Sequence, residues 1–169
     1  MRLVAYWDEI EPREGAYEFQ NLDWQLEQAK AQGIPVVLTV GMKAPRWPEY
    51  FIPVWVLRRV RLRKGSDVTA NAYLRERTLR FLQAVVSRYK DEAIIHYWQV
   101  ENEPMDRAGP GAWWIGGEFL EEEVKLVRSL DANRRPILIT AATFPHRTLR
   151  FFARFFRRDD PIAKGLALG

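Results

Sequence analysis

Residues 94–104 read Ile-Ile-His-Tyr-Trp-Gln-Val-Glu-Asn-Glu-Pro. Residues 94–100 are mostly β-branched, aromatic and apolar, which is typical of a buried strand. Glu101 and Glu103 follow directly, and Pro104 ends the segment. Because an unpaired carboxylate is costly to bury, two carboxylates at the end of an apolar strand indicate a specific role.

The segments on both sides of this strand alternate between two patterns. Apolar runs of strand length occur in four other places: residues 3–7, 34–40, 136–142 and 166–169. Apolar residues recur at helical spacing in the segments between them: residues 22–29, 67–89, 119–130 and 149–156. In the third of these helices, Glu121, Glu122 and Glu123 are expected to form an acidic first turn that complements the helix dipole. Strands and helices in alternation predict a parallel α/β sheet.

Two architectures have this alternation, a doubly wound open sheet and a (β/α)8 TIM barrel. A doubly wound sheet is expected to carry a glycine-rich phosphate-binding loop after its first strand. Here the first strand runs into residues 8–12, Asp-Glu-Ile-Glu-Pro, an acidic segment that would repel phosphate. The barrel is therefore favoured. Since a complete barrel takes about 250 residues, the 169 residues predict one partial barrel domain over residues 1–169.

The composition excludes several other classes of protein. The chain is 47% hydrophobic and has no cysteine, which excludes disulfides, thiolate zinc sites and cysteine nucleophiles. It has no apolar run long enough to span a bilayer and no signal-peptide pattern, so we expect no membrane partner and assign no compartment. The net charge is +4, and arginines gather at residues 147–158. They alternate with apolar residues as on the wet face of a helix, so we expect no nucleic-acid partner.

The end of the strand at residues 94–100 is the predicted active site, because barrel enzymes carry catalytic residues at the C-terminal ends of their strands. A glutamate in a partly apolar, aromatic-lined pocket has a raised pKa. It can then hold a proton near neutral pH and deliver it to a leaving oxygen. Asn102 beside it can hydrogen-bond a substrate hydroxyl. In the alternative interpretation, Glu101 and Glu103 pair with arginines at the edge of the sheet.

Three blocks of the sequence resemble the clan A glycoside hydrolases, the group that includes cellulases, mannanases and many β-galactosidases. Residues 98–104 resemble the motif on the fourth strand of these enzymes. Residues 6–19, with Leu22-Asp23 after them, are similar to their second strand and its loop. Residues 33–38, with Ala44-Pro45-Arg46-Trp47 after them, are similar to their third strand and its exit loop. The resemblance covers the chain from Arg2 to about Ala142.

The resemblance implies a (β/α)8 barrel, of which this chain covers roughly strands two to six. It also implies retaining, double-displacement hydrolysis of β-linked oligosaccharides or polysaccharides, with no metal and no other cofactor. Glu103 matches the acid/base of the family, and Asn102 matches the residue that contacts the sugar 2-hydroxyl. Arg2 is similar to the strand-two arginine that orients the nucleophile.

The nucleophile of these enzymes is a glutamate on the seventh strand, which the strand count places beyond this chain. A retaining glycosidase needs two carboxyl groups about 5–5.5 Å apart. Glu101 is expected to point to the same side of the strand as Glu103, so it is a poor nucleophile candidate. Glu49 is better explained as a solvated charge in a loop. The chain by itself is therefore expected to be inactive or nearly so.

Aromatic residues gather near the predicted strand ends: Trp7, Trp47, Tyr50, Phe51, Trp55, Trp113 and Trp114. Aromatic rings cover the apolar C–H faces of sugars, and Trp47 is the predicted sugar platform. His96 lies inside a predicted strand and is expected in the core.

An alternative function comes from a different class. A shortened barrel could serve as a non-catalytic carbohydrate-binding or assembly module that keeps its aromatic cleft. A partial barrel exposes strand edges and apolar helix faces, so self-association through these surfaces is expected in that case.

Overall fold

The computed structural model describes residues 1–141. Its elements, in chain order, are β1 (Arg2–Val4), α1 (Trp7–Ile10), α2 (Gln20–Ala31), β2 (Val36–Val40), α3 (Val54–Leu57), the 3₁₀ helix η1 (Val68–Ala70), α4 (Ala72–Tyr89), β3 (Ile95–Val100), α5 (Gly117–Leu130) and β4 (Ile137–Leu138). The basic helix predicted at residues 149–156 and the strand predicted at residues 166–169 lie outside the described residues.

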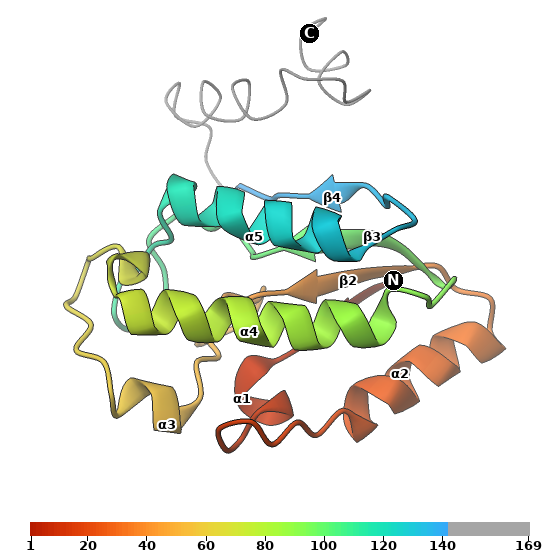
Figure 1. Cartoon of the computed structure of the whole chain (residues 1–169), viewed down its shortest axis with the longest axis horizontal. Coiled ribbons are helices and arrows are strands. Elements are labelled where there is room, and N and C mark those ends of the chain that lie inside the picture. Colours follow the sequence, from red (N-terminus) through yellow and green to blue (C-terminus); the bar gives the residue numbers. More distant parts are fainter. Residues whose placement is uncertain (142–169) are drawn as a thin grey trace, which may run out of the picture.

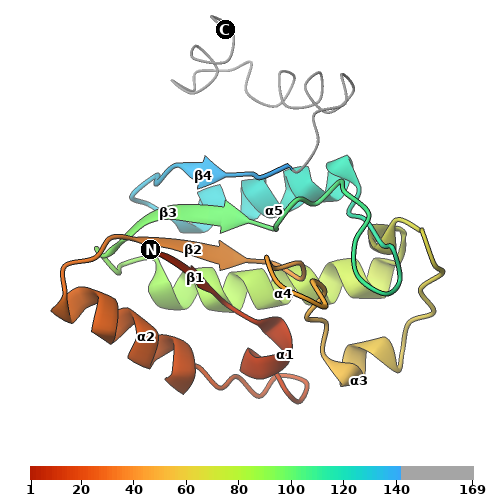
Figure 2. The same ribbon diagram turned by 180° about the vertical axis from the view of Figure 1, so that it is seen from behind.

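The strands form one parallel sheet in the order β1-β2-β3-β4. Helices α4 and α5 lie on one face of this sheet, and the view from behind shows the strands in front of them (Figures 1 and 2). A doubly wound sheet reverses its strand order at a switch point and carries helices on both faces. Within residues 1–141 the strand order follows the chain without reversal, which is the arrangement of a barrel wall.

The core lies between the sheet and the helices. Leu38 of β2 pairs with Trp98 of β3 across the sheet, and both side chains are fully buried. On the helical side, Phe81 of α4 stacks on Trp7, with ring centroids 5.4 Å apart. The predicted strand at residues 3–7 is therefore shorter than expected, because Trp7 begins α1 and contributes to the core.

The opposite face of the sheet is only partly covered. Val37 of β2 is half-buried, and its neighbour Tyr97 of β3 is 40% exposed. His96 is exposed as well, so its predicted place in the core is wrong. The register between β2 and β3 shifts between Val36 and Val37, which pair with Ile95 and Tyr97. His96 is the extra residue of this bulge, and a bulged residue leaves the alternation of the strand.

The predicted helix over residues 67–89 is divided into two elements by two capping side chains. Asp67 accepts a hydrogen bond from the backbone N–H of Thr69 at 2.9 Å at the start of η1. Asn71 accepts one from the N–H of Leu74 at 3.0 Å at the start of α4. Asp and Asn favour such cap positions over helix interiors, so the second cap fixes where the long helix begins.

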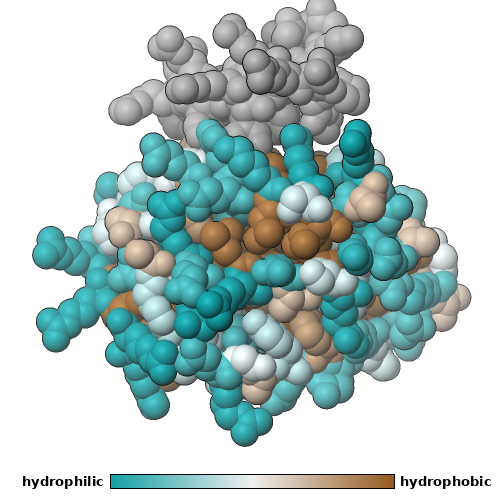
Figure 3. Space-filling view, viewed as in Figure 1, coloured by the Kyte–Doolittle hydropathy of each residue, from teal (hydrophilic) through white to brown (hydrophobic). Residues whose placement is uncertain are grey.

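Apolar side chains gather on the helical face of the molecule, over α4 and α5 (Figure 3). Leu79 and Leu126 line a hollow of about 400 Å³ there, between the polar side chains of both helices. The hollow lies along the helices and not at the strand ends. No helix within residues 1–141 has the length and apolar content needed to cross a membrane.

Candidate active site

The loops that leave β2 and β3 run side by side beyond the C-terminal ends of these strands. The backbone N–H of Glu101 donates to the carbonyl of Val40 at 2.9 Å, and that of Asn102 donates to the carbonyl of Lys43 at 2.9 Å. These two bonds continue the pairing of the strands and hold the start of each loop against the other. Residues far apart in the sequence thereby meet at one edge of the sheet.

A hollow of about 360 Å³ lies at this edge, with eight residues lining it: Arg2, Pro45, Arg46, Trp47, Glu49, Asn102, Glu103 and Thr140. The four residues that the sequence nominates for the site, Arg2, Trp47, Asn102 and Glu103, are all among them. They come from β1, from the loop after β2 and from the loop after β3. The fold therefore brings the nominated residues together in one place.

Glu103 sits in a left-handed backbone conformation, with φ +47°. Its backbone N–H donates to the hydroxyl of Thr140 at 3.0 Å, and its carbonyl accepts from the ammonium of Lys43 at 2.5 Å. Non-glycine residues adopt this conformation rarely, and such strain concentrates at functional sites. The half-buried side chain of Glu103 is thus presented to the hollow by a backbone that is held from both sides.

Glu101 does not point the same way as Glu103, contrary to the sequence-based expectation. Its side chain is completely buried, and its two oxygens accept from the backbone N–H groups of Met42 (2.8 Å) and Lys43 (2.6 Å). The alternation of a strand does not apply here, because β3 ends at Val100 and Glu101 has φ +58°.

The alternative of arginine-paired glutamates at the sheet edge is not what the described residues show. Within residues 1–141, the ion pairs of arginine go to other carboxylates. Glu101 is held by backbone N–H groups, and Glu103 lines the hollow.

Lys43 is a buried cation that the sequence reasoning missed. Its ammonium donates to the carbonyls of Glu103 (2.5 Å) and Asp106 (2.9 Å), and it lies 3.8 Å from a carboxylate oxygen of Glu49. Burial lowers the pKa of Lys43, and the nearby carboxylates, first Glu49, oppose this effect. The ammonium therefore ties the loop after β2 to the loop after β3. A lysine placed three residues after the apolar strand Val36–Val40 is the signal that could have revealed it.

Asn102 lies in the wall of the hollow beside Glu103 and is 6% exposed. Its side-chain oxygen is 3.4 Å from the amide nitrogen of Gln99 and 3.4 Å from the hydroxyl of Thr140. These long contacts anchor the carboxamide at the base of the loop. A fixed amide at the wall of a hollow can hydrogen-bond a ligand hydroxyl.

Trp47 presents its ring to solvent at the hollow, with 71% of the residue exposed. Trp7, Tyr50 and Phe51, which the sequence also offered, are buried. Trp113 packs edge-on against Tyr50, with ring centroids 5.5 Å apart. An exposed indole beside polar groups fits a sugar ring, which has both apolar and hydroxylated faces.

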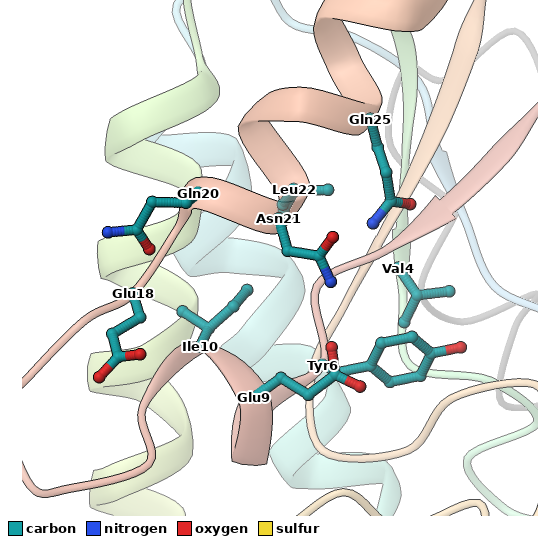
Figure 4. Close-up of a pocket in the computed structure, with 9 residues that line it drawn as sticks. All are labelled: Val4, Tyr6, Glu9, Ile10, Glu18, Gln20, Asn21, Leu22 and Gln25. Atoms are coloured by element: carbon teal, nitrogen blue, oxygen red, sulfur yellow. The ribbon is translucent and has the colours of Figure 1, made fainter.

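A second hollow of about 240 Å³ lies beside β1, between α1 and the first turns of α2 (Figure 4). Its polar side chains are amides, carboxylates and the phenol of Tyr6, and they include Glu9, Asn21 and Gln25. Neither Asn102 nor Glu103 lines it. Within residues 1–141, no three histidine or carboxylate side chains are grouped as ligands of a metal ion would be.

Comparisons with known proteins connect this fold to glycosidases. The chain is 28% identical over 114 residues to beta-galactosidase Bga of Halorubrum lacusprofundi, a match that covers 61% of this chain and 16% of that protein. It is 27% identical over 136 residues to mannan endo-1,4-beta-mannosidase 3 of Solanum lycopersicum, covering 69% of this chain and 32% of the relative. The chain thus spans a third or less of these relatives.

A solved structure has the same fold over most of the chain. Xylanase 10B of Thermotoga petrophila RKU-1, in complex with xylobiose, superposes with a TM-score of 0.66 at 16% identity, over 93% of this chain and 48% of that one. The fold is therefore part of a (β/α)8 glycosidase barrel. The sequence profile of the beta-galactosidase family, glycoside hydrolase family 42, matches residues 3–109. The chain belongs to the family 42 beta-galactosidases.

Proposed function

We propose that this chain supplies the acid/base part of a retaining β-glycosidase site, with Glu103 as the proton donor. The observation that carries the proposal is that Arg2, Trp47, Asn102 and Glu103 line one hollow at the C-terminal edge of the sheet. Barrel enzymes act at this edge. Substrates of this class would be β-linked oligosaccharides, since the relatives include a beta-galactosidase and a mannan endo-1,4-beta-mannosidase.

The proposed reaction has two steps. In the first, the Glu103 carboxylic acid gives its proton to the glycosidic oxygen as the bond to the anomeric carbon breaks and a carboxylate nucleophile attacks that carbon. In the second, the Glu103 carboxylate takes a proton from water, whose oxygen displaces the nucleophile and releases the sugar. In this scheme Asn102 holds the 2-hydroxyl, Trp47 lies under a sugar ring, and Arg2 orients the nucleophile.

We propose that none of residues 1–141 is the nucleophile of this scheme. Glu49 is the other carboxylate in the hollow, and one of its oxygens lies 3.8 Å from the ammonium of Lys43. It leaves the loop after β2, next to the Glu103 loop, whereas the two carboxyl groups must approach the sugar from different directions. We therefore propose that a residue other than Glu49 is the nucleophile.

The first prediction is that the chain by itself does not turn over β-glycosides. Nitrophenyl β-galactoside and nitrophenyl β-mannoside are incubated with the chain, and release of nitrophenolate is followed by absorbance. We expect a rate equal to that of buffer, because acid catalysis without a nucleophile leaves the double displacement incomplete. Turnover by the chain that disappears in Glu103→Gln would contradict this prediction.

The second prediction concerns Trp47. Trp47→Ala is expected to weaken binding of a β-linked oligosaccharide by about fivefold, because loss of a ring contact costs about 1 kcal/mol. Trp24→Ala is the matched control, since Trp24 is 62% exposed and lies on α2, away from the hollow. Calorimetric titration with mannotriose and with lactose measures both variants. Equal losses in the two variants would show that Trp47 is not the platform.

The same hollow supports a second candidate, carbohydrate binding without hydrolysis. Binding in the titration combined with no turnover by any complete barrel that contains this segment would favour it. The assembly alternative rests on the partly covered face of the sheet, where Val37 is half-buried and Tyr97 is 40% exposed. Self-association through this face is a proposal that light scattering over a range of concentrations tests.

A further inference from the structure

Two buried carboxyl groups meet behind the hollow. Glu101 comes from the end of β3 and Glu123 from the second turn of α5, and both residues are completely buried. Their carboxyl groups are in hydrogen-bonding contact. Neither residue lines the hollow, so the proposed reaction leaves the pair without a role.

The two carboxyl groups differ in their hydrogen bonds. Glu101 accepts from the N–H groups of Met42 and Lys43, one on each oxygen. Within residues 1–141, no donor reaches either oxygen of Glu123. Two ionised carboxylates are both acceptors and repel each other, so a hydrogen bond between them requires a proton on one of the two.

The bonds indicate which group holds that proton. Both oxygens of Glu101 are already used as acceptors, and the ammonium of Lys43 favours its charge. Burial raises the pKa of Glu123, and the charge of Glu101 raises it further. A protonated Glu123 donates to Glu101, which satisfies both groups. If Glu101 held the proton instead, its O–H would either face a backbone N–H group or donate to Glu123. In the second case the negative charge would lie on Glu123, which no other donor among the described residues reaches.

The pair is connected to Glu103 by direct contacts. Glu101 fixes the backbone of Met42 and Lys43, and the Lys43 ammonium in turn holds the carbonyls of Glu103 and Asp106. Each link spans 2.9 Å or less. The contacts therefore run without a gap from α5 to the backbone of Glu103.

We propose that Glu123 holds a proton that it shares with ionised Glu101, and that this pair, through Lys43, is a positioning device for Glu103. Glu101, Glu123 and Lys43 are thus positioning residues and not catalytic ones. The inference goes beyond the proposed function. Only the last step of the inference, that the position of Glu103 matters for activity, rests on the proposed function.

Charged and titratable groups face the pair from every neighbouring element. Lys43 and Tyr50 of the loop after β2 interact with Glu101, and Glu122 of α5 interacts with Glu123. Glu49, Glu103 and Asp106 surround the ammonium of Lys43. Lys43 is the cation in this group, and its position next to Glu101 favours a single negative charge on the pair. A second charge would add to the field of the surrounding carboxylates.

The pair makes stability depend on pH in a defined direction. A glutamate in the unfolded chain has a pKa near 4.5, whereas burial of Glu101 and Glu123 raises the pKa at which the pair releases its shared proton. Between these values the folded chain binds more protons than the unfolded chain, so stability falls as the pH rises. The contribution is complete below the unfolded value and is lost as the pH rises through the folded values.

The test compares two isosteric variants with a control on the same helix. Glu123→Gln keeps a donor toward Glu101 and removes the proton, so we expect it to fold and to lose the pH dependence that this pair causes. Glu101→Gln places an N–H₂ group against one of the two backbone N–H groups that Glu101 accepts from, so we expect a lower melting temperature at every pH. Glu121→Gln is the control, because Glu121 makes a surface pair with Lys125 at 3.5 Å.

The measurement is the melting temperature between about pH 5 and about pH 8. The wild-type and Glu121→Gln chains are expected to lose roughly 5–10 °C more over this range than Glu123→Gln. The infrared difference spectrum between the wild type and Glu123→Gln at neutral pH should contain the carbonyl band of a protonated carboxylic acid. The protection of the Glu103 amide against hydrogen exchange, taken relative to the intrinsic base-catalysed rate, should fall at alkaline pH in the wild type but not in Glu123→Gln.

Three results would overturn the inference. They are a melting temperature of Glu123→Gln that depends on pH as in the wild type, equal melting temperatures of Glu101→Gln and Glu123→Gln, and a carboxylic-acid carbonyl band that Glu123→Gln leaves unchanged. If Glu101→Gln does not fold, the pH dependence of the melting temperature and the infrared carbonyl band of Glu123→Gln still test the inference. None of these readouts uses a sugar. A failure here is therefore distinguishable from a failure of the glycosidase proposal.

Discussion

Glu103→Gln is expected to lower the hydrolysis of β-glycosides with poor leaving groups by about 10²–10⁴-fold in a complete barrel that contains residues 1–141. Glutamine has the shape of glutamate but no acidic proton to give. An alkoxide leaving group needs that proton as its bond to the anomeric carbon breaks. Loss of the proton donor should therefore act on the rate of the first step and hardly on substrate binding.

A chimeric barrel provides the complete site for this measurement. Residues 1–141 of this chain, which include the segment 3–109 that the family profile matches, replace the corresponding segment of beta-galactosidase Bga. Activity of the parent chimera is established first. The rates kcat and kcat/KM of the Glu103→Gln chimera are then measured with lactose and with a dinitrophenyl β-galactoside, whose leaving group departs without protonation.

The pattern across the two substrates identifies the role of Glu103. An acid/base variant loses activity on lactose far more than on the dinitrophenyl glycoside, where added azide can replace water in the second step. Glu49→Gln is the matched control, since Glu49 lines the same hollow and is not expected to donate the proton. Equal losses on both substrates would mean that Glu103 supports the structure and not the proton transfer.

Gly41→Ala is expected to destabilise the fold by about 2–6 kcal/mol, combining overpacking with backbone strain. A Cβ atom at Gly41 would lie 2.3 Å from the carboxyl carbon of Glu101, and Gly41 has φ +125°. The carboxyl group cannot move aside, because two backbone N–H groups and Glu123 hold it. Since whole domains are stable by only about 5–15 kcal/mol, this variant is expected to approach unfolding.

Gly33→Ala separates strain from overpacking. Gly33 has φ +62°, and a Cβ atom added there would meet nothing within 4 Å, so alanine should cost only about 1–2 kcal/mol of backbone strain. Urea unfolding of both variants gives the two free energies. If Gly41→Ala loses no more than Gly33→Ala, the tight packing of Glu101 under the loop is refuted.

Much of the fold could be predicted from sequence periodicity. The apolar run at residues 34–40 contains β2, and the run at residues 94–100 contains β3. The helix expected at residues 22–29 is α2, which ends just before Gly33. These elements were predictable because their apolar pattern and the packing of the sheet agree. The observed bounds of the other elements differ from the predicted ones because capping side chains and the early start of α1 at Trp7 set them.

The hollow could be predicted because its residues follow strand ends, but the network behind it could not. The alternation rule fails at Glu101, where the backbone turns left-handed directly after β3. The sequence predicts one acidic first turn of the helix, made of Glu121, Glu122 and Glu123. However, α5 already begins at Gly117, and Glu123 faces the core. Sequence composition does not show which of three adjacent glutamates is buried.

The most direct test of the central claim is a crystal structure of the Glu103→Gln chain with a bound β-linked disaccharide. We expect the sugar in the hollow of about 360 Å³, with one ring on Trp47, a hydroxyl on Asn102 and the glycosidic oxygen next to residue 103. A disaccharide bound instead in the hollow between α1 and α2 (Figure 4), with the Trp47 ring uncovered, would contradict it.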